Sequence, residues 1–475
     1  MRPLALRAGG DAPAKLGAGD LARRSWRTRL RAAVAAAGLV AATAFAPSAA
    51  SAQVPASQDR PTARADAQRW LQDAKFGVFL HWGLYSQLGG AGQSGLSEWA
   101  MEELRMPAAS YERLAQFFHP SQYDADAWVR AFKAAGARYI VVTSKHHDGF
   151  AMFASKVSPY NVVDATPFRR DPLKELADAC GRHGVKLFFY YSQLDWHHPD
   201  YFPRGRTGNH AGRPAAGDWD RYLEFQNAQL RELLTGYGPI GGIWFDGWWD
   251  QQHTAMEGRW RLQETYDLIH RLQPNALIVN NHHVTPFPGE DYQAFERDLP
   301  GVNTLGHNRA EVSSLPLEMA ETMNGSWGFS LTDRKFKSTA TLIRSLVGAA
   351  GRNSNFLLNT GPMPNGRIQP ENLRTFAEIG SWLERYGESV YGTRAGPVAP
   401  RAWGVTTRRG KQVYVHVLNW AETRLPLPLA ADVRSATDMR DGSAVQVRRR
   451  SGGLELALRP ARDGDVDRVI RLTLR

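Results

Sequence analysis

The sequence predicts an α/β protein in which a (β/α)8-like barrel is followed by a small antiparallel β-sandwich. Three observations support this fold class. Short apolar runs alternate with longer amphipathic stretches from about residue 70 to residue 390, polar and aromatic residues gather where the apolar runs end, and short β-rich runs replace this pattern after Gly396. Alternating strands and helices are typical of βαβ units and of a parallel sheet.

The expected elements follow from the two periodicities. The apolar runs that we expect to be barrel strands lie at residues 76–81, 139–144, 186–192, 242–246, 276–280 and 355–359. The amphipathic stretches that we expect to be helices lie at residues 124–135, 173–183, 218–234, 257–272, 339–350 and 371–386. The β-rich runs of the expected sandwich lie at residues 404–407, 412–419, 433–438, 445–449, 454–458 and 469–474. The sixth and seventh barrel strands are poorly marked between Asn281 and Phe329.

Two parallel architectures compete for the first part of the chain. A doubly wound nucleotide-binding sheet usually carries a Gly-rich phosphate loop after its first strand, and no such spacing is present. A barrel instead forms its active site at the carboxyl ends of its strands. Here the apolar runs lead into His81, into residues 144–149, into Tyr191 and into Asp246. This pattern favours the barrel.

The N-terminal segment is typical of an export signal. A basic stretch at residues 23–31 precedes an apolar run of small residues at 32–46, and Ala50-Ser51-Ala52 resembles a cleavage site. The apolar run is shorter than the roughly 20 residues that a membrane-spanning helix needs. We therefore expect residues 1–52 to be a signal peptide. The mature protein is expected to be exported to the periplasm or the extracellular space, without a membrane span.

Composition sets the remaining domain boundaries. Residues 53–66 are polar and contain proline, which predicts a linker. The barrel is then expected to form a catalytic domain at residues 67–393, and the sandwich a C-terminal domain at residues 394–475. Cys180 is the only cysteine, so no intramolecular disulfide can form and the fold depends on its core.

The net charge of +11 does not indicate a nucleic-acid partner. Residues 1–52 contain eight basic and two acidic residues and so carry +6 of it. The remaining positive charge is spread along the chain, apart from a short cluster at residues 448–450. No run of Lys and Arg is dense enough to follow a phosphate backbone.

Asp246 is the first candidate for chemistry. It ends an apolar strand and is followed by Gly247, Trp248 and Trp249. A carboxylate in such surroundings must be satisfied by neighbours or take part in a reaction. The alternative role is structural, as a cap for the following loop.

Two further clusters lie at predicted strand ends and loops. His146-His147-Asp148 contains common zinc ligands, but there is no HExxH helix and no second cluster to complete a metal site, and hydrogen bonding to hydroxyl groups fits at least as well. Glu98-Trp99, in a Gly-rich segment, pairs an acceptor with a flat apolar face, a combination that suits a sugar.

If Asp246 is the nucleophile in the cleavage of a glycoside, a second carboxyl group is required across the scissile bond. The candidates in the later loops are Glu290, Glu296, Glu311, Glu318 and Glu321. Residue chemistry alone does not rank these five.

Five strings together resemble glycoside hydrolase family 29, the α-L-fucosidases. They are FGVFLHWG at residues 76–83, KHHDGF at 145–150, KLFFYYSQLDW at 186–196, IWFDG at 243–247 and NFLLNTG at 355–361. The resemblance extends from about Trp70 to Thr393, with the motifs in the family's order. KHHDGF after a strand, combined with a later WFDG, is a specific pairing.

The resemblance implies a barrel with a C-terminal β-sandwich, a retaining double displacement, and no need for a metal or other cofactor. Its expected substrates are fucosylated oligosaccharides or glycoconjugates. It assigns the nucleophile to Asp246. It also assigns a group of substrate-binding residues: His81, Glu98, Trp99, His146, His147, Tyr191 and Trp244.

The same resemblance assigns the general acid/base to Glu318. Residues 314–329 (SLPLEMAETMNGSWGF) resemble the segment in which a Glu precedes a Thr and an aromatic-Gly-aromatic string. The sequence departs from the commoner pattern at Leu317, where a Trp often stands, and at Ala320, where a Cys is frequent. Glu296 is the first alternative for the acid/base, and Glu98 the second.

Two more contacts are expected from the resemblance. Arg297 is expected to contact the sugar, and Trp99, Trp244 or Trp327 to offer an apolar wall for the fucose methyl group. Two other functions stay open. One is a barrel glycosidase for a different deoxy or galacto-configured sugar. The other is a carbohydrate-binding protein with a degenerate site, which the presence of Asp246 and of several acid candidates argues against.

Overall fold

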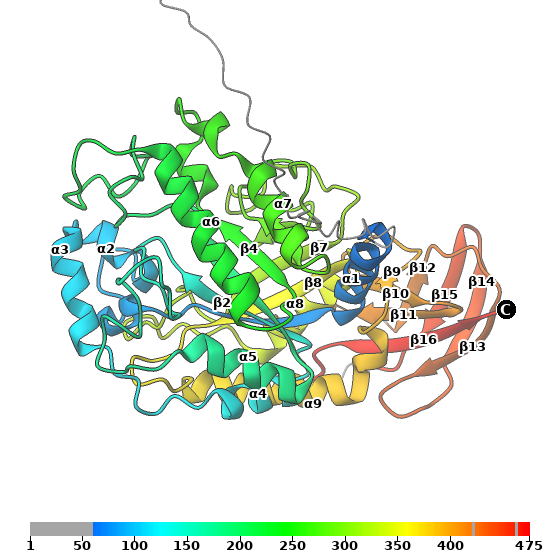
Figure 1. Cartoon of the computed structure of the whole chain (residues 1–475). Helices are drawn as coiled ribbons and strands as arrows, with labels where there is room; N and C mark the ends of the chain where they lie inside the picture. Colours follow the sequence, from blue (N-terminus) through cyan, green and yellow to red (C-terminus); the bar gives the residue numbers. More distant parts are fainter. Residues whose placement is uncertain (1–59, 420–422, 461–463) are drawn as a thin grey trace, which may run out of the picture. The chain divides into compact units, whose positions relative to one another are not determined.

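The computed structural model describes residues 60–419, 423–460 and 464–475 (Figure 1). The predicted signal peptide, residues 1–52, lies outside the described residues. Among the helices of the described residues, none combines the length and the apolar character that crossing a membrane requires. The described chain forms a barrel followed by two antiparallel sheets, which confirms the predicted fold class.

Eight parallel strands form a nearly closed barrel in the order β5-β4-β3-β2-β1-β8-β7-β6. The strands are β1 (Phe76–Leu80), β2 (Tyr139–Lys145), β3 (Lys186–Ser192), β4 (Gly242–Asp246), β5 (Leu277–Asn280), β6 (Gln293–Glu296), β7 (Leu317–Thr322) and β8 (Ser354–Thr360). The six strands that the sequence marked clearly lie where they were predicted. β6 and β7 fill the region in which no strand could be located.

Six helices connect or follow the strands: α4 (Ala125–Ala134), α5 (Pro172–His183), α6 (Trp219–Gly236), α7 (Leu262–Leu272), α8 (Thr339–Ala350) and α9 (Pro370–Tyr386). Side chains of Asp124, Asp171, Asp218 and Ser338 cap the N-termini of α4, α5, α6 and α8. The connections from β5 to β6 and from β6 to β7 contain no helix, so the barrel is (β/α)8-like rather than regular.

One predicted helix is divided. The stretch predicted as a single helix at residues 257–272 consists of the 3-10 turn η5 (Glu257–Arg259) and α7. Arg261 separates them with a left-handed backbone, φ 49°, which a continuing helix does not allow.

Short helices occupy the loops at the carboxyl ends of β1 and β4. After β1 come η1 (Leu84–Leu88), η2 (Ser97–Trp99), α2 (Ala100–Glu103), α3 (Ala108–Tyr111) and η3 (Glu112–Phe117), and after β4 comes η4 (Trp248–Gln251). These long, structured loops are positioned to cover the end of the barrel at which active sites form.

The strand side chains alternate between the barrel interior and the surrounding helices. Phe79, Phe188 and Tyr190 belong to the interior cluster. Their strand neighbours, such as Phe189 and Tyr191, belong to the larger cluster packed against the helices. This period of two decides which side chain of each strand can reach an active site at the barrel end.

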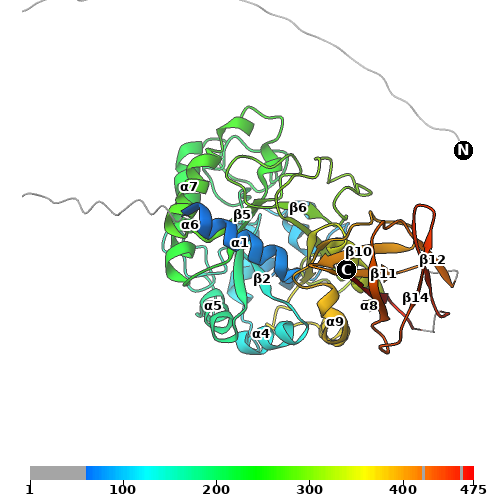
Figure 2. The same ribbon diagram turned by 90° about the vertical axis from the view of Figure 1, so that its right-hand side faces the viewer.

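Helix α1 (Arg60–Ala74) packs against the amino ends of the strands (Figure 2). Its Leu71 is fully buried in the interior cluster, and the Leu71 carbonyl accepts a hydrogen bond of 2.7 Å from Asn355 near the start of β8. Gln68 donates to the Asp291 carbonyl just before β6. Helix α1 begins at Arg60, within the stretch predicted as a linker.

The C-terminal sheets have the strand orders β13-β16-β11-β10-β9 and β12-β15-β14. Their strands are β9 (Arg394–Ala395), β10 (Gly404–Arg409), β11 (Gln412–Val417), β12 (Arg424–Leu427), β13 (Val433–Asp438), β14 (Gln446–Arg450), β15 (Gly453–Ala457) and β16 (Arg468–Leu474). Residues from both sheets, such as Val415 and Leu456, share one apolar core, as a sandwich requires. The short strands β9 and β12 were not predicted.

The sandwich contacts the barrel near the amino ends of its strands. Gly351, which ends α8, lies so close to Val405 of β10 that an added Cβ would meet the Val405 Cβ at 2.4 Å. Thr407 donates to the Ser389 carbonyl in η6 (Gly387–Ser389) at 2.6 Å, and Arg471 forms an ion pair with Glu388. These contacts leave the carboxyl ends of the strands uncovered by the sandwich.

Removing the Leu71 side chain should therefore weaken the barrel. We expect Leu71→Ala to lower the free energy of unfolding by about 2–4 kcal/mol, because it empties a fully buried site between α1 and the strands. Urea denaturation checks this, with Arg69→Ala on the exposed side of α1 as the control. Equal stability of the two variants would show that α1 does not support the barrel.

Candidate active site

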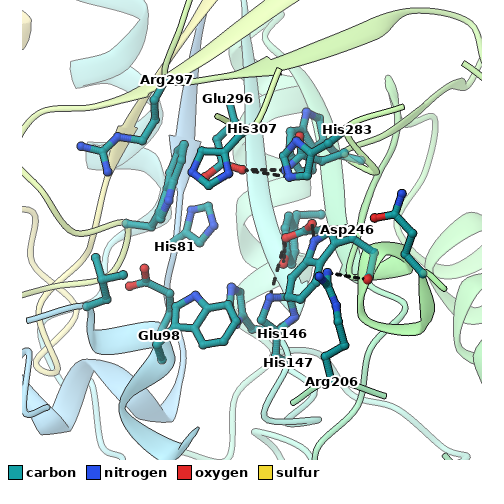
Figure 3. Close-up of a pocket in the computed structure, with 18 of the residues that line it drawn as sticks. His81, Glu98, His146, His147, Arg206, Asp246, His283, Glu296, Arg297 and His307 are labelled. Carbon is teal, nitrogen blue, oxygen red and sulfur yellow. Dashed lines mark hydrogen bonds and ion pairs between the residues drawn. The ribbon is translucent and has the colours of Figure 1, made fainter. Parts of the chain in front are cut away.

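A cavity of about 640 Å³ opens at the carboxyl ends of the barrel strands (Figure 3). Its lining includes side chains that follow or end six of the strands: His81, His146, His147, Tyr190, Asp246, Asn281, His283, Glu296 and Arg297. A single pocket therefore collects polar residues from most of the barrel, as the sequence predicted for strand ends. Its volume lies within the usual range for small-molecule sites.

Asp246 is the last residue of β4, and its carboxylate accepts three hydrogen bonds. Tyr190 of β3 donates to Oδ2 at 2.9 Å, while the Trp249 indole and the Gly247 amide donate to Oδ1 at 2.9 and 2.8 Å. Gly247 has φ 88°, and an added Cβ would meet Leu194 at 2.7 Å, so glycine is required there. The chain turns so tightly after β4 that the carboxylate is fixed in place.

The surroundings of Asp246 act on its ionisation in opposite directions. Burial raises its pKa to about 7, and the negative charge of Glu296 acts in the same direction. The three hydrogen bonds favour the ionised form. His147 Nε2 lies 3.8 Å from Oδ2. Asp246 is thus a carboxylate held in a low-dielectric pocket, close to a second carboxyl group.

That second group is Glu296, the last residue of β6. Its side chain lines the cavity and is 20% exposed. Asn281 donates to Oε2 at 2.9 Å, and His283 Nε2 lies 3.6 Å from the same oxygen. The next residue, Arg297, has a left-handed backbone with φ 59°. Such strain in a non-glycine residue is common beside functional groups.

Glu318, to which the resemblance assigned the acid/base role, does not line the cavity. It is the second residue of β7 and is fully buried inside the barrel. Its oxygens accept hydrogen bonds from Tyr139 and, at 3.0 Å, from the Trp244 indole. Glu296 stands at the carboxyl end of its strand, whereas Glu318 lies near the amino end of the neighbouring strand. The two candidates therefore differ in how far each lies from the carboxyl end of its strand.

Tyr191 does not line the cavity either, and this predicted contact also requires correction. Its side chain points outward, and its hydroxyl donates to Gln229 of α6 at 2.8 Å. The preceding residue, Tyr190, points inward and binds Asp246. Because strand side chains alternate, an error of one residue moved the prediction to the wrong face of the barrel.

Two predicted histidines are fixed as hydrogen-bond acceptors toward the cavity. Ser192 donates to the Leu194 carbonyl at 2.6 Å, so its oxygen accepts from His147 Nδ1 at 2.7 Å. Burial lowers the pKa of His147 well below its usual value, so the ring is neutral and Nε2 carries a lone pair.

The same reasoning applies to His81. Asn359 donates through its amide nitrogen to the Trp327 carbonyl at 2.7 Å, which leaves its oxygen to accept from His81 Nδ1 at 2.7 Å. Burial lowers the pKa of His81 to about 3, so this ring too is neutral. Its Nε2 is therefore an acceptor.

The His-His-Asp string does not converge on one point. His146 and His147 line the cavity, and the His146 ring stacks on Tyr190 at 5.3 Å. Asp148 instead accepts a hydrogen bond of 2.8 Å from Tyr111, outside the cavity lining. Among the described residues, no group of three or more His, Cys, Asp and Glu side chains is arranged to hold a metal ion.

Glu98 and Trp99 lie in the cavity wall, as predicted. Glu98 Oε2 accepts from the Gly328 amide at 2.9 Å and from Ser326, while Oε1 is buried without a partner among the described residues. Burial raises the pKa of Glu98. Trp99 stacks on Trp249, with ring centroids 5.9 Å apart.

Three aromatic side chains form an apolar wall. Phe79 packs against Trp244 at 5.1 Å and against Trp327 at 5.9 Å, and all three line the cavity. Of the residues predicted to bind substrate, only Tyr191 lies elsewhere. Arg297 also lines the cavity, 3.7 Å from Glu321.

Sequence reasoning missed several lining residues: Tyr190, Arg206, Trp249, His253, Asn281, His283, His307 and Arg309. Tyr190 and Trp249 were recoverable, because Tyr190 lies near the end of an apolar strand on its inner face and Trp249 closely follows Asp246. Arg206, His307 and Arg309 come from loops that have no periodic pattern, and nothing in the sequence locates them.

A family model described as Alpha-L-fucosidase matches residues 42–388. The chain belongs to the alpha-L-fucosidase family. It is accordingly a glycoside hydrolase of the α-L-fucosidase type, and the family predicted from the motifs is confirmed.

Curated relatives and solved structures agree with this family assignment. The structure of alpha-L-fucosidase isoenzyme 1 from Paenibacillus thiaminolyticus is 34% identical with a TM-score of 0.76, over 87% of this chain and 100% of that one. A covalent intermediate of a GH29 alpha-L-fucosidase from Bacteroides thetaiotaomicron, trapped with 2-fluoro-fucosyl fluoride, is 29% identical with a TM-score of 0.75, over 86% and 96%. The tissue alpha-L-fucosidase of Homo sapiens is 28% identical over 78% of this chain and 79% of its own length.

The interior position of Glu318 has a measurable consequence for stability. Burial raises its pKa to about 7, whereas an unfolded chain has a glutamate pKa of about 4.3. Between these values the folded protein keeps a proton that the unfolded chain has lost, so the Glu318 contribution to stability falls as pH rises. We expect the Tm of Glu318→Gln minus that of the wild type to increase between pH 4 and pH 8.

The same variant tests the geometry of the site. Because Glu318 does not line the cavity, kcat/KM of Glu318→Gln on an aryl α-L-fucoside should stay within roughly tenfold of the wild-type value. Thermal melts and initial rates provide both measurements. A loss as large as that of Glu296→Gln, with the fold intact, would show that Glu318 acts in the reaction.

Proposed function

We propose that the protein is an exo-acting, retaining α-L-fucosidase that releases terminal α-L-fucose from fucosylated glycans. The observation that carries this proposal is the pairing of Asp246 and Glu296 in one cavity, at the ends of β4 and β6. Glycoside hydrolysis needs two carboxyl groups on opposite sides of the scissile bond. The trapped covalent intermediate of the Bacteroides thetaiotaomicron relative supports a double displacement.

Asp246 is the proposed nucleophile. Its carboxylate attacks the anomeric carbon, and the bond to the leaving oxygen breaks as a covalent fucosyl-enzyme forms. The donors Tyr190, Trp249 and Gly247 fix the carboxylate and stabilise its negative charge before the attack. A nucleophile held in this way needs little reorganisation on the way to the transition state.

Glu296 replaces Glu318 as the proposed general acid/base. In the first step it gives its proton to the departing oxygen, and in the second it removes a proton from the water that releases fucose. Asn281 and the nearby His283 hold its carboxyl group at the edge of the cavity. The first step requires that Glu296 carries a proton while Asp246 is ionised. The hydrogen bonds to Asp246 stabilise its ionised form and so favour this arrangement of charge.

The deep part of the cavity is proposed to hold the fucose ring. Nε2 of His81, Nε2 of His147 and the free Oε1 of Glu98 are all acceptors, so a ligand must supply the donors. The hydroxyl groups of a sugar meet this requirement. The wall of Phe79, Trp244 and Trp327 offers an apolar surface to the C6 methyl group of fucose, which a sugar with a polar C6 cannot exploit.

The remaining domain assignments are part of the same proposal. We propose that residues 1–52 direct export and that residues 67–393 form the catalytic domain. Residues 394–475 are proposed to support the barrel at the amino ends of its strands, through the contacts of Gly351 with Val405 and of Glu388 with Arg471.

Azide rescue separates the two catalytic roles. For Asp246→Gly we expect a large loss of kcat, partly restored by azide, with β-L-fucosyl azide as the product because azide attacks from the side that Asp246 vacates. For Glu296→Ala we expect kcat to fall by roughly 10²–10⁴-fold on substrates with poor leaving groups. Azide should then yield the retained α-L-fucosyl azide, and product anomers are identified by NMR.

Glu318→Gln is the matched control for this experiment, since it removes a different carboxyl group from the same barrel. It should form no fucosyl azide above the wild-type level. If a Glu318 variant gives the α-azide while Glu296→Ala retains near-wild-type activity, the assignment of the acid/base is overturned.

The pH profile tests the charge coupling between Asp246 and Glu296. With α-L-fucosyl fluoride, which needs no acid for its leaving group, kcat/KM should rise with pH through about 7, as Asp246 becomes ionised. In Glu296→Gln the negative charge that raises the Asp246 pKa is gone, so this limb should move to lower pH. A limb that stays in place or moves upward would contradict the coupling.

A further inference from the structure

The mouth of the cavity differs in charge from its interior. Of the three acidic side chains of the lining, Glu98 and Asp246 belong to its buried inner part, whereas Glu296 lies at the cavity edge and is 20% exposed. Arg206 and Arg309 also line the cavity but are exposed to solvent. A sugar ring in the deep pocket would therefore project its attached group past two guanidinium groups.

Arg206 is held at the mouth by a loop docked onto the turn that follows Asp246. The backbone of Arg206 donates to the Asp250 carbonyl at 3.0 Å, and Thr207 donates twice to the Asp250 carboxylate. Gly205 lies so close to Asp250 that an added Cβ would meet its Oδ2 at 1.9 Å. The guanidinium lies over the Trp249 ring at 5.5 Å and donates to the Trp249 carbonyl.

Arg309 is held by a second loop, which is clamped to Glu296. Asn308 accepts from the Glu296 amide at 3.0 Å and donates to the Glu296 carbonyl at 2.9 Å. The Arg309 Nε donates only to the Gly306 carbonyl, at 3.1 Å. Two arginines from separate loops are thus positioned by the elements that carry Asp246 and Glu296.

The two arginines flank the proposed catalytic carboxyl groups, Arg206 on the turn after Asp246 and Arg309 on the loop beside Glu296. Arg309 belongs to the loop clamped on Glu296, the proposed acid. His283 lies 3.6 Å from Glu296. Burial lowers the pKa of His283, and the positive charge of Arg206 acts in the same direction, so Arg206 lies near this side as well. Figure 3 labels Arg206, Asp246, His307 and Glu296 among the residues that line the pocket.

Neither guanidinium forms a close ion pair among the described residues, and Arg206 acts on the buried carboxylate of Asp250 only through its charge. Within the described residues, no carboxylate lies within ion-pair distance of Arg206 or Arg309, whereas Arg297 of the same lining has Glu321 at 3.7 Å. The free donors of both guanidinium groups are therefore available to a ligand. A planar anion such as a carboxylate, or a sulfate, is the group that guanidinium binds best.

We propose that Arg206 and Arg309 form a subsite for an anionic group, a carboxylate or a sulfate ester, on the residue attached to the fucose. This subsite rests on the proposed function, since it selects among fucosylated glycans by the charge next to the scissile bond. It strengthens binding of the attached residue and contributes no proton to the reaction.

Aryl α-L-fucosides that differ only in charge test this subsite. The neutral probe carries a para carbamoylmethyl group, and the anionic probes carry carboxymethyl or sulfomethyl groups at the same position. The methylene spacer keeps the phenol leaving groups similar. The two anionic arms distinguish a preference for carboxylate from a preference for a sulfur oxyanion.

We expect the wild-type ratio of kcat/KM, anionic over neutral probe, to be roughly 3 to 10 at low ionic strength and to fall with added salt. In the double variant Arg206→Gln, Arg309→Gln the ratio should fall to near one. Arg448→Gln, which removes an exposed positive charge from β14 of the sandwich, is the matched control and should keep the wild-type ratio.

The possible outcomes separate this inference from the proposed function. If all probes are hydrolysed with a ratio near one, or if the double variant keeps the wild-type ratio, the anionic subsite is overturned while the fucosidase function stands. If none of the probes is hydrolysed, the proposed function itself fails. Use of the ratio removes any general loss of activity caused by the substitutions.

Discussion

The carboxylate of Asp246, buried at the end of β4, is the interaction on which the site depends. A charge in a pocket of low dielectric is costly unless donors meet it, and here they come from three directions: Tyr190 on β3, Trp249 in η4 and the Gly247 amide. Each donor reaches the carboxylate only if the strand or turn that carries it is correctly placed against β4. The tight turn at Gly247 and the inward face of β3 are therefore conditions for an ionised nucleophile.

In the barrel, the position of a residue along its strand decides its chemical role. Glu296 and Glu318 stand on adjacent strands, and Glu296 is paired in register with Ala320, two residues beyond Glu318. That offset is enough to separate a carboxyl group at the cavity edge from one that binds Tyr139 and Trp244 inside the barrel. Glu318 then acts on the site indirectly, by accepting the hydrogen bond of the Trp244 indole N–H and so orienting a ring that belongs to the aromatic wall.

The sequence was most informative where an apolar strand pattern ended in residues that can take part in chemistry. Asp246, His81 and the His146-His147 pair end strongly apolar strands, so the barrel geometry alone brings them together. β6 escaped detection because it has four residues, two of them only partly buried, and no flanking helix. The resemblance assigned Tyr191 rather than Tyr190, and a two-residue period does not reveal which of two adjacent residues faces inward. The loop arginines carry no pattern at all, since tertiary anchoring through Asp250 and Asn308 positions them.

The charge distribution of the pocket follows from these anchors. Deep in the cavity, the Nε2 atoms of the neutral His81 and His147 and the free oxygen of Glu98 are available as acceptors, which suits a ligand rich in hydroxyl donors. At the mouth, the guanidinium groups of Arg206 and Arg309 are hydrogen-bond donors, and each binds one backbone carbonyl, of Trp249 and of Gly306. The two loops that supply these arginines are hydrogen-bonded to Asp250, four residues after the nucleophile, and to Glu296 itself. Any movement of the proposed catalytic carboxyl groups would therefore be transmitted to the rim, so that recognition of the attached residue and the reaction at the anomeric carbon share one rigid framework.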